Sequence, residues 1–324
     1  MEKRRIVAVV LAVLLGASAY AQTTDFFELV KSRTPQQTQL AINNGADPKA
    51  WEDGWTPLMV AAGNNQNPDV IATLLRAGAD PKVQNEWYGW TALMVAAGNN
   101  QNPDVIATLM KAGADIKAQD KNGETALMWA ASSNPNPEVI ITLLKAGADV
   151  KARATIARFI GLTPLMVAAE NNQNPEVIAT LLKAGADIKE QDVHGFTVLM
   201  AAAWRNQNPE VITTLLKARA DIKAQDENGE TALMWAARDN SNSEVISTLL
   251  KAGAGVNARD KDNQTPLMIA AVNNQNPKVI STLLNAGADG KARDSKGKTA
   301  FDYAQNHRDL SATDAYQQLQ EASQ

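Results

Sequence analysis

The chain has 324 residues, contains no Cys, and carries a formal net charge of −4 at pH 7. The absence of Cys excludes disulfides, thiol catalysis and zinc–thiolate sites. The acidic balance argues against nucleic acid as the main partner.

The N-terminus has the pattern of a secretory signal peptide. Three basic residues at positions 3–5 precede ten apolar residues at positions 6–15, and Ala19 and Ala21 stand where a signal peptidase requires small residues. We expect residues 1–21 to be a signal peptide that is cleaved after Ala21, so that the protein is exported to the periplasm or beyond. A retained membrane anchor is the alternative, but ten apolar residues are few for a transmembrane helix. Cleavage removes three basic residues and one acidic residue, and no later stretch is apolar enough to span a membrane.

After the leader, one motif repeats along the chain. T-x-L-M, followed closely by Ala-Ala, begins at Thr56, Thr91, Thr125, Thr163, Thr197, Thr231 and Thr265, and a degenerate copy begins at Thr299. A period of this length predicts stacked supersecondary units that present a long surface. Each Thr is a predicted N-cap, and Leu, Met and the two Ala residues predict a short first helix.

Two Asn residues recur between this helix and the next. The first series, which we interpret as left-handed C-caps, is Asn65, Asn100, Asn134, Asn172, Asn206, Asn240 and Asn274. The second series stands two residues later, and Pro follows it in six of seven copies, as expected for the N-cap of a second helix. That helix has one apolar face, as in Val139, Ile140, Leu143 and Leu144.

The copies resemble ankyrin repeats in the pattern D-x-x-G-x-T-P-L, then A-A, then V-x-x-L-L-x-x-G-A-D. The resemblance implies an all-α solenoid of about nine helical pairs joined by extended β-turn fingers. We expect an N-terminal capping unit at 22–55, seven repeats at 56–298 and a C-terminal capping unit at 299–324.

The chain departs from the family at the position of its usual His. Met stands there instead, at Met59, Met94, Met128, Met166, Met200, Met234 and Met268. A row of Met could bind a soft metal, but its helical spacing favours an apolar core, and we expect no metal or other cofactor.

The repeats differ mainly in their fingers, and we expect function where they differ. The predicted partner-binding residues of the fingers are Trp51, Trp55, Trp87, Tyr88, Trp90, Arg158, Phe159, Ile160, His194 and Phe196. Exposed aromatic residues beside Arg are typical of interface hot spots. The alternative is that each aromatic residue packs against the next finger. Trp204, Arg205 and Arg238 are further candidates at a position that faces the concave groove in this family, whereas Trp129 and Trp235 are expected to line the core.

The sequence offers no catalytic site. It has two His residues, His194 and His307, which the stack would hold far apart. We therefore predict a monomeric, non-enzymatic protein that binds an unknown protein partner through the fingers and the concave face. Binding of a non-protein envelope ligand, such as a glycan, through the Trp-rich fingers is the alternative.

Overall fold

The computed structural model describes residues 26–156, 159–305 and 310–324, with the side chains of 155, 156 and 159 left aside. The predicted signal peptide, Arg158, the side chain of Phe159 and His307 lie outside this part of the chain. Within it, no helix is both long enough and apolar enough to cross a membrane.

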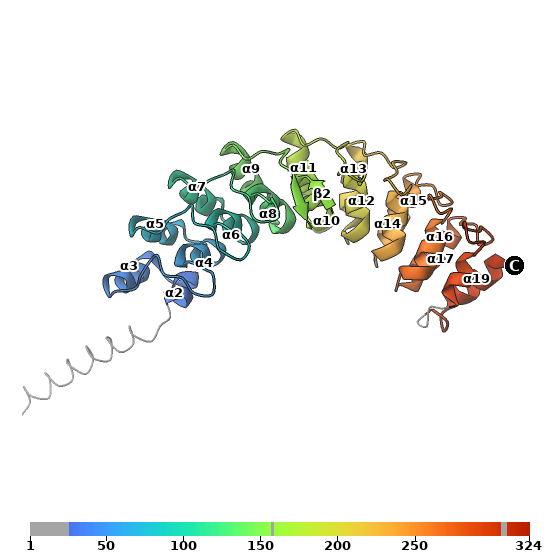
Figure 1. Cartoon of the computed structure of the whole chain (residues 1–324), viewed down its shortest axis with the longest axis horizontal. Helices are drawn as coiled ribbons and strands as arrows, with labels where there is room; N and C mark the ends of the chain where they lie inside the picture. Colours follow the sequence, from blue (N-terminus) through green and yellow to red (C-terminus); the bar gives the residue numbers. More distant parts are fainter. Residues whose placement is uncertain (1–25, 157–158, 306–309) are drawn as a thin grey trace, which may run out of the picture.

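In the described part of the chain, nine pairs of helices follow one another along an arch (Figure 1). The pairs are α2 (Phe26–Ser32) with α3 (Pro35–Asn43), α4 (Pro57–Asn64) with α5 (Pro68–Arg76), α6 (Ala92–Asn99) with α7 (Pro103–Lys111), α8 (Ala126–Ser133) with α9 (Pro137–Lys145), α10 (Pro164–Asn171) with α11 (Pro175–Lys183), α12 (Val198–Arg205) with α13 (Pro209–Lys217), α14 (Ala232–Asp239) with α15 (Ser243–Lys251), α16 (Pro266–Asn273) with α17 (Pro277–Asn285), and α18 (Ala300–Ala304) with α19 (Asp314–Ser323). The expected solenoid of about nine pairs is confirmed.

The arch is curved because its two layers of helices pack differently. The first helices of neighbouring pairs, such as α4, α6 and α8, pack closely and lie on the inner side of the arch (Figure 1). Their Ala pairs, for example Ala96 and Ala97, are fully buried and allow this close approach. The second helices, such as α5 and α7, pack more loosely on the outer side, so the inner layer forms a concave face.

The predicted caps and core are present in every repeat. The Thr56 hydroxyl accepts a hydrogen bond from the Met59 backbone N–H at 3.2 Å, and each sister repeat has the same cap. All seven Met residues of the motif are at most 1% exposed, so the core interpretation is confirmed. In three repeats the Met sulfur also accepts the N–H of its own capping Thr, as Met200 does from Thr197 at 3.4 Å.

The prediction of left-handed Asn caps is wrong. Asn100 has an extended backbone, with φ −94° and ψ 124°, and its side chain is fully buried. Its side-chain amide donates to the carbonyl oxygens of Ala62 and Asn65, both at 2.9 Å, in the preceding repeat. The other six Asn residues make the same two bonds to the unit before them. The series is a ladder of buried amides that joins each repeat to the previous one.

Backbone hydrogen bonds join several pairs of neighbouring fingers. The Lys121 N–H donates to the Tyr88 carbonyl oxygen at 2.9 Å, and Val193 donates to Ile160 at 3.1 Å. The fourth finger is long enough to form an antiparallel hairpin, β1 (Ala154–Ile156) with β2 (Phe159–Leu162). Because the bonds run from finger to finger, a fingertip side chain keeps a defined position relative to its neighbours.

Candidate binding surface: two aromatic clusters

The first aromatic cluster forms around Trp90, on the second finger. The Trp90 ring stacks on Tyr88 with centroids 4.5 Å apart, meets Trp129 edge-on at 4.9 Å, and lies 5.7 Å from Trp55 at a tilt of 55°. These geometries are the ones that aromatic pairs favour, and each pair adds about 1 kcal/mol beyond the burial of its area. For Trp55 and Trp90 these contacts match the alternative raised from the sequence, in which aromatic residues of neighbouring fingers pack against one another.

Trp87 lies at the edge of this cluster and remains accessible. Its ring covers Gly54 of the preceding finger so closely that a Cβ on Gly54 would lie 3.0 Å from ring carbon Cε3. The side that faces away is open, because Trp87 is 55% exposed and Tyr88 is 52% exposed. Together they form a solvent-facing aromatic surface on a rigid support.

Trp51 does not join the cluster. It lines a separate hollow of about 380 Å³ with Lys49, Gly78 and Val83. Trp51 is exposed, so it stays accessible, but on a different part of the surface. Trp51 and Trp55 of the first finger therefore line different hollows.

A groove of about 450 Å³ opens beside Trp55, on the concave side of the first repeats. We call it the N-terminal groove; it is lined by Phe27, Glu28, Lys31, Glu52, Asp53, Trp55, Val60, Gly63, Asn64, Val95 and Asn99. Gly63 lines the groove, and its lack of a side chain lets Val95 pack close to the α4 backbone, since a Cβ on Gly63 would lie 2.8 Å from Val95 Cγ1. Of these residues only Trp55 is among those that the sequence singled out. The recurrence of Gly at this position in two neighbouring repeats, Gly63 and Gly98, is the signal that could have located the groove.

The second aromatic cluster is largely internal. The rings of Phe196, Trp204 and Trp235 meet edge-to-face, with centroid distances of 5.0 to 6.4 Å. Phe196 is 1% exposed, so its prediction as a surface contact is wrong; Trp235 of the next repeat packs across it. Trp204 is 8% exposed and therefore presents little surface to a partner. Trp235 lines the core, as expected.

Both indole N–H groups of this cluster donate to carboxylates. Trp204 Nε1 donates to Asp239 Oδ2 at 2.8 Å, and Trp235 Nε1 donates to Asp226 Oδ2 at 2.9 Å. These bonds satisfy polar groups that would otherwise be buried without partners. They also fix both rings, which makes this part of the concave face rigid.

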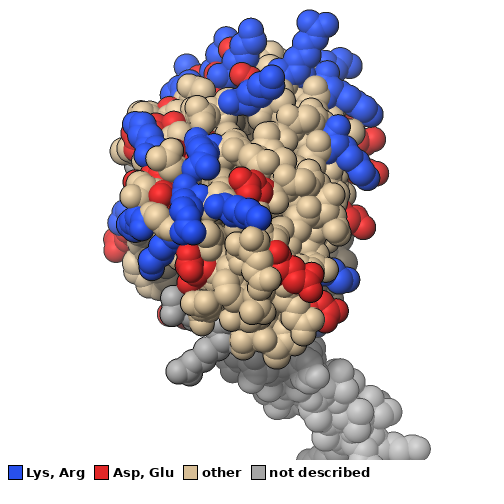
Figure 2. Space-filling model, turned by 90° about the vertical axis from the view of Figure 1, so that its right-hand side faces the viewer, with Lys and Arg blue, Asp and Glu red and all other residues tan. Residues whose placement is uncertain are grey.

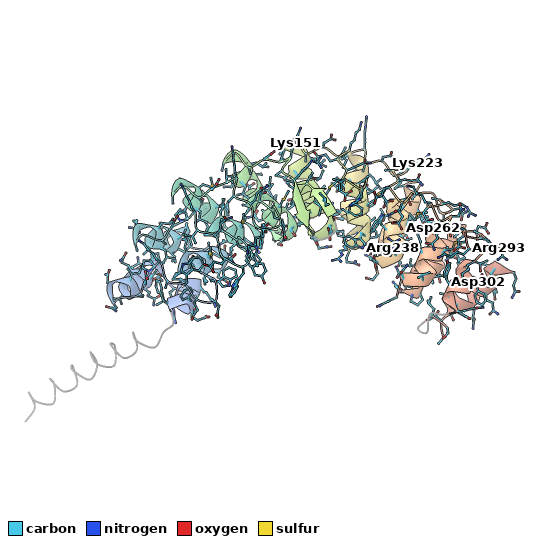
Figure 3. All side chains as sticks on the ribbon, viewed as in Figure 1. Lys151, Lys223, Arg238, Asp262, Arg293 and Asp302 are labelled. Carbon is cyan, nitrogen blue, oxygen red and sulfur yellow. The ribbon has the colours of Figure 1, made fainter. Side chains whose placement is uncertain are left out.

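Two Arg side chains cover the second cluster from the concave side. The Arg205 guanidinium lies 4.1 Å from the Trp204 ring centroid, and the Arg238 guanidinium lies 5.0 Å from that of Trp235. Arg238 also forms a two-bond ion pair with Glu230, whereas Arg205 lies 3.8 Å from Glu170. Arg205 is the more accessible of the two (Arg238 is labelled in Figure 3).

Burial shifts the pKa of the two carboxyl groups that lie beside these Arg residues. Desolvation raises the pKa of Glu170 above its ordinary value, although the charge of Arg205 opposes the shift. Desolvation likewise raises the pKa of Glu230, against the hydrogen bonds and charge of Arg238. Each Arg side chain thus opposes the effect of burial on the pKa of the carboxyl group beside it.

The remaining predicted contacts lie on the fourth and fifth fingertips. Ile160 is 46% exposed and lies beside Val193, which is 62% exposed. His194 Nδ1 lies 2.9 Å from Glu227 Oε1 of the next finger, and that hydrogen bond raises the pKa of His194. These fingers add a smaller apolar patch, away from the first cluster.

The last fingers are polar and carry both charges. Lys261, Asp262, Lys296 and Lys298 are exposed there. Figure 2, which views the C-terminal end of the arch, shows Lys and Arg side chains interspersed with Asp and Glu. Among the described residues, the exposed large aromatic side chains are Trp51, Trp87 and Tyr88 of the first two fingers. Across the described residues, no group of three or more His, Asp or Glu side chains is arranged to hold a metal ion.

A family model of ankyrin repeats in three copies matches the chain in overlapping segments, 26–120, 58–154, 100–192, 152–226, 199–294 and 233–312. The chain belongs to the ankyrin repeat family. Ankyrin repeats are general protein–protein interaction modules, and the family is typically a non-enzymatic scaffold. A search of curated proteins finds no match. In the described part of this ankyrin repeat protein, accessible surfaces that hold predicted contact residues include the edge of the first aromatic cluster, the N-terminal groove, the hollow beside Trp51 and the tips of the fourth and fifth fingers.

Proposed function

We propose that the protein binds a partner protein through the first two fingers and the adjoining concave face. The observation that carries the proposal is the exposed aromatic surface of Trp87 and Tyr88, which are 55% and 52% exposed on the second finger, whose Tyr88 carbonyl oxygen accepts a hydrogen bond from Lys121 of the third finger. Large rigid aromatic side chains supply contact area at a low cost in conformational entropy. A preordered surface loses little further entropy when a partner binds.

We further propose that this binding takes place outside the cytoplasm, because the N-terminal 21 residues have the pattern of a signal peptide. Cleavage after Ala21 would leave Gln22 as the mature N-terminus, a short distance before α2 begins at Phe26. N-terminal sequencing of the protein recovered from the envelope fraction tests the cleavage site directly.

Crosslinked capture from a native envelope extract tests the binding surface. Trp87→Ala removes the exposed ring of the second finger, and Trp51→Ala is a matched control, because it removes a similarly exposed Trp that lines a separate hollow. We expect Trp87→Ala to lose a specific protein that the wild-type chain and Trp51→Ala both retain. Helicity and melting temperature should change little, since both side chains are exposed. Equal recovery by all three proteins would remove the second finger from the binding surface.

The same exposed rings favour one second candidate function. Exposed Trp and Tyr faces can stack on sugar rings, so a glycan of the cell envelope could occupy the first two fingers. Titration of tryptophan fluorescence with soluble glycan fragments separates the two functions. A saturable change that Trp87→Ala abolishes would favour the glycan, whereas a flat response would favour the protein partner.

A further inference from the structure

The N-terminal groove has an apolar floor and an aromatic wall. Val60 and Val95 form the floor with Gly63, whose lack of a side chain lets Val95 pack close to the α4 backbone. Trp55 forms the wall, and its ring is held at a fixed tilt by Trp90. A surface of this kind suits an aliphatic or long flexible side chain that can lie along it.

The charge at the mouth of the groove is negative. Glu28 and Lys31 of α2 form an ion pair with each other, so their charges are already matched. Glu52 and Asp53 of the first finger are exposed, and among the described residues neither carboxylate has a side-chain hydrogen bond or an ion pair. In contrast, the first Asp of each polar finger, such as Asp226, accepts hydrogen bonds from the backbone of its own turn. The two carboxylates are therefore available to a ligand.

The backbone holds this pair of carboxylates in place. Asp53 has a positive φ of 46°, and Glu52 exchanges two backbone hydrogen bonds with Trp55, at 2.8 and 3.0 Å. Trp87 packs on Gly54 from the other side. The closed turn fixes the backbone of Glu52 and Asp53 next to Trp55, and all three residues line the N-terminal groove. An aromatic face beside free carboxylates attracts a cation.

We infer that the N-terminal groove binds a Lys or Arg side chain of an extended segment of the partner protein. This inference rests on the proposed function. The aliphatic stem would lie on Val60 and Gly63 against Trp55, and the cationic end would lie between Glu52 and Asp53. A hollow of about 450 Å³ is large enough for one long side chain and part of its flanking backbone. A neutral glycan would leave both carboxylates unpaired, and an acidic segment would be repelled by them.

Selection from a random-peptide library displayed on phage tests this inference with a defined probe. The full-length mature protein is used as bait, and peptides that it enriches are synthesised and titrated. We expect a Lys or Arg at one fixed position, and replacement of that residue by norleucine should weaken binding about tenfold, because a charge-assisted hydrogen bond is lost. Binding should also weaken as salt increases.

Two matched variants locate the cationic residue. Asp53→Asn neutralises one carboxylate of the groove, and Asn tolerates the positive φ at this position. Asp262→Asn makes the same change at the equivalent place of a distant finger, three residues before Thr265 as Asp53 is before Thr56 (Asp262 is labelled in Figure 3). We expect the peptides to lose several-fold in affinity for Asp53→Asn, to lose more for Glu52→Gln combined with Asp53→Asn, and to bind Asp262→Asn as they bind the wild type.

The outcomes separate this inference from the function on which it rests. Peptides that lose affinity for Trp87→Ala but bind the charge variants normally would overturn the cation site and leave the binding surface intact. Peptides that bind Trp87→Ala and the charge variants as tightly as they bind the wild type would count against both the cation site and the proposed function. Recovery of no peptide, or of peptides without a Lys or Arg preference, would also overturn the cation site, and the proposed function would then be judged by the capture experiment alone.

Discussion

The side-chain amide of Asn134 donates to the carbonyl oxygen of Asn100 at 2.8 Å, although the two residues are 34 positions apart. The same amide reaches the Ala97 carbonyl oxygen at 2.8 Å, and the Asn134 side-chain oxygen accepts from the Asn136 N–H at 3.0 Å. Because Asn134 is fully buried, none of these groups can turn to water. Each rung of this ladder thus joins the end of one first helix to the loop of the previous repeat.

Replacement of one buried Asn of this ladder should lower the stability of the fold. We expect Asn134→Ala to lower the free energy of unfolding by about 3 kcal/mol, because two buried carbonyl oxygens lose a donor and one N–H loses its acceptor. Ser133→Ala is the control, since Ser133 is the exposed neighbour at the end of the same helix. Urea denaturation of both variants gives the comparison, and similar midpoints would show that the ladder does not stabilise the stack.

Glu124 should destabilise the folded protein at neutral pH. Burial, and then repulsion from Asp120, raises the pKa of the Glu124 carboxyl above its ordinary value of 4.5, although a hydrogen bond with Asn122 opposes the shift. A raised pKa means that the folded state binds the proton more tightly than the unfolded state. The ionised carboxylate therefore costs stability above its folded-state pKa, and this cost disappears as the pH falls below 4.5.

Glu124→Gln measures that cost. At pH 7 the variant should melt on the order of 1–2 °C above the wild type, a small shift because the carboxyl keeps some contact with water. The difference between the two proteins should shrink towards zero as the pH approaches 4. A difference that stays constant with pH would mean that it arises from packing and not from charge.

Ser132→Arg should offset the cost of the partly buried Glu124 carboxylate by giving it a positively charged partner. Glu124 and Ser132 occupy the places in their repeat that Glu230 and Arg238 occupy in a later repeat, where the two side chains are paired. Trp129 likewise corresponds to Trp235, whose ring Arg238 covers at 5.0 Å. We expect Ser132→Arg to pair with Glu124 and to raise the melting temperature at pH 7.

A double-mutant cycle checks the pairing. In the Ser132→Arg background, Glu124→Gln should no longer stabilise the protein, and it should instead remove a partner from the new Arg. Coupling between the two changes would establish the ion pair. Strictly additive effects would show that the introduced guanidinium points elsewhere.

Gly290 should be required for docking of the last helix. Its sister positions hold side chains such as Ile222 and Val256, but a Cβ on Gly290 would lie 2.6 Å from the carbonyl oxygen of Ala322 in α19. We expect Gly290→Val to displace α19 and to increase hydrogen exchange in α17, α18 and α19, while the central repeats stay protected. Ile222→Val is the control, since a side chain at that position has room. Unchanged exchange in the last three helices would contradict the prediction.

Part of the candidate site followed from the sequence. Trp87 and Tyr88 stand at the tip of a finger, where a repeat has no core to bury them, and both are exposed. Phe196 is also an aromatic residue of a finger, but it lies directly before the capping Thr197. At that position its ring packs against Trp235 of the next repeat. Whether an aromatic residue of a finger is buried thus depends on the neighbouring repeat, which holds Trp in two copies and Val, Ala or Ile in the others.

The sequence by itself determined the period, the Thr and Asn helix starts and the Met core, because these depend on residues a few positions apart that recur in every copy. Only the tertiary structure decided the role of the first Asn series and the place of the N-terminal groove. Asn100 has extended backbone and not a left-handed cap because its amide finds two carbonyl oxygens in the preceding repeat. The groove likewise needs α2, the first finger, α4 and α6 together. Contacts between residues about 35 positions apart set these features, and no local pattern records which partner a side chain meets.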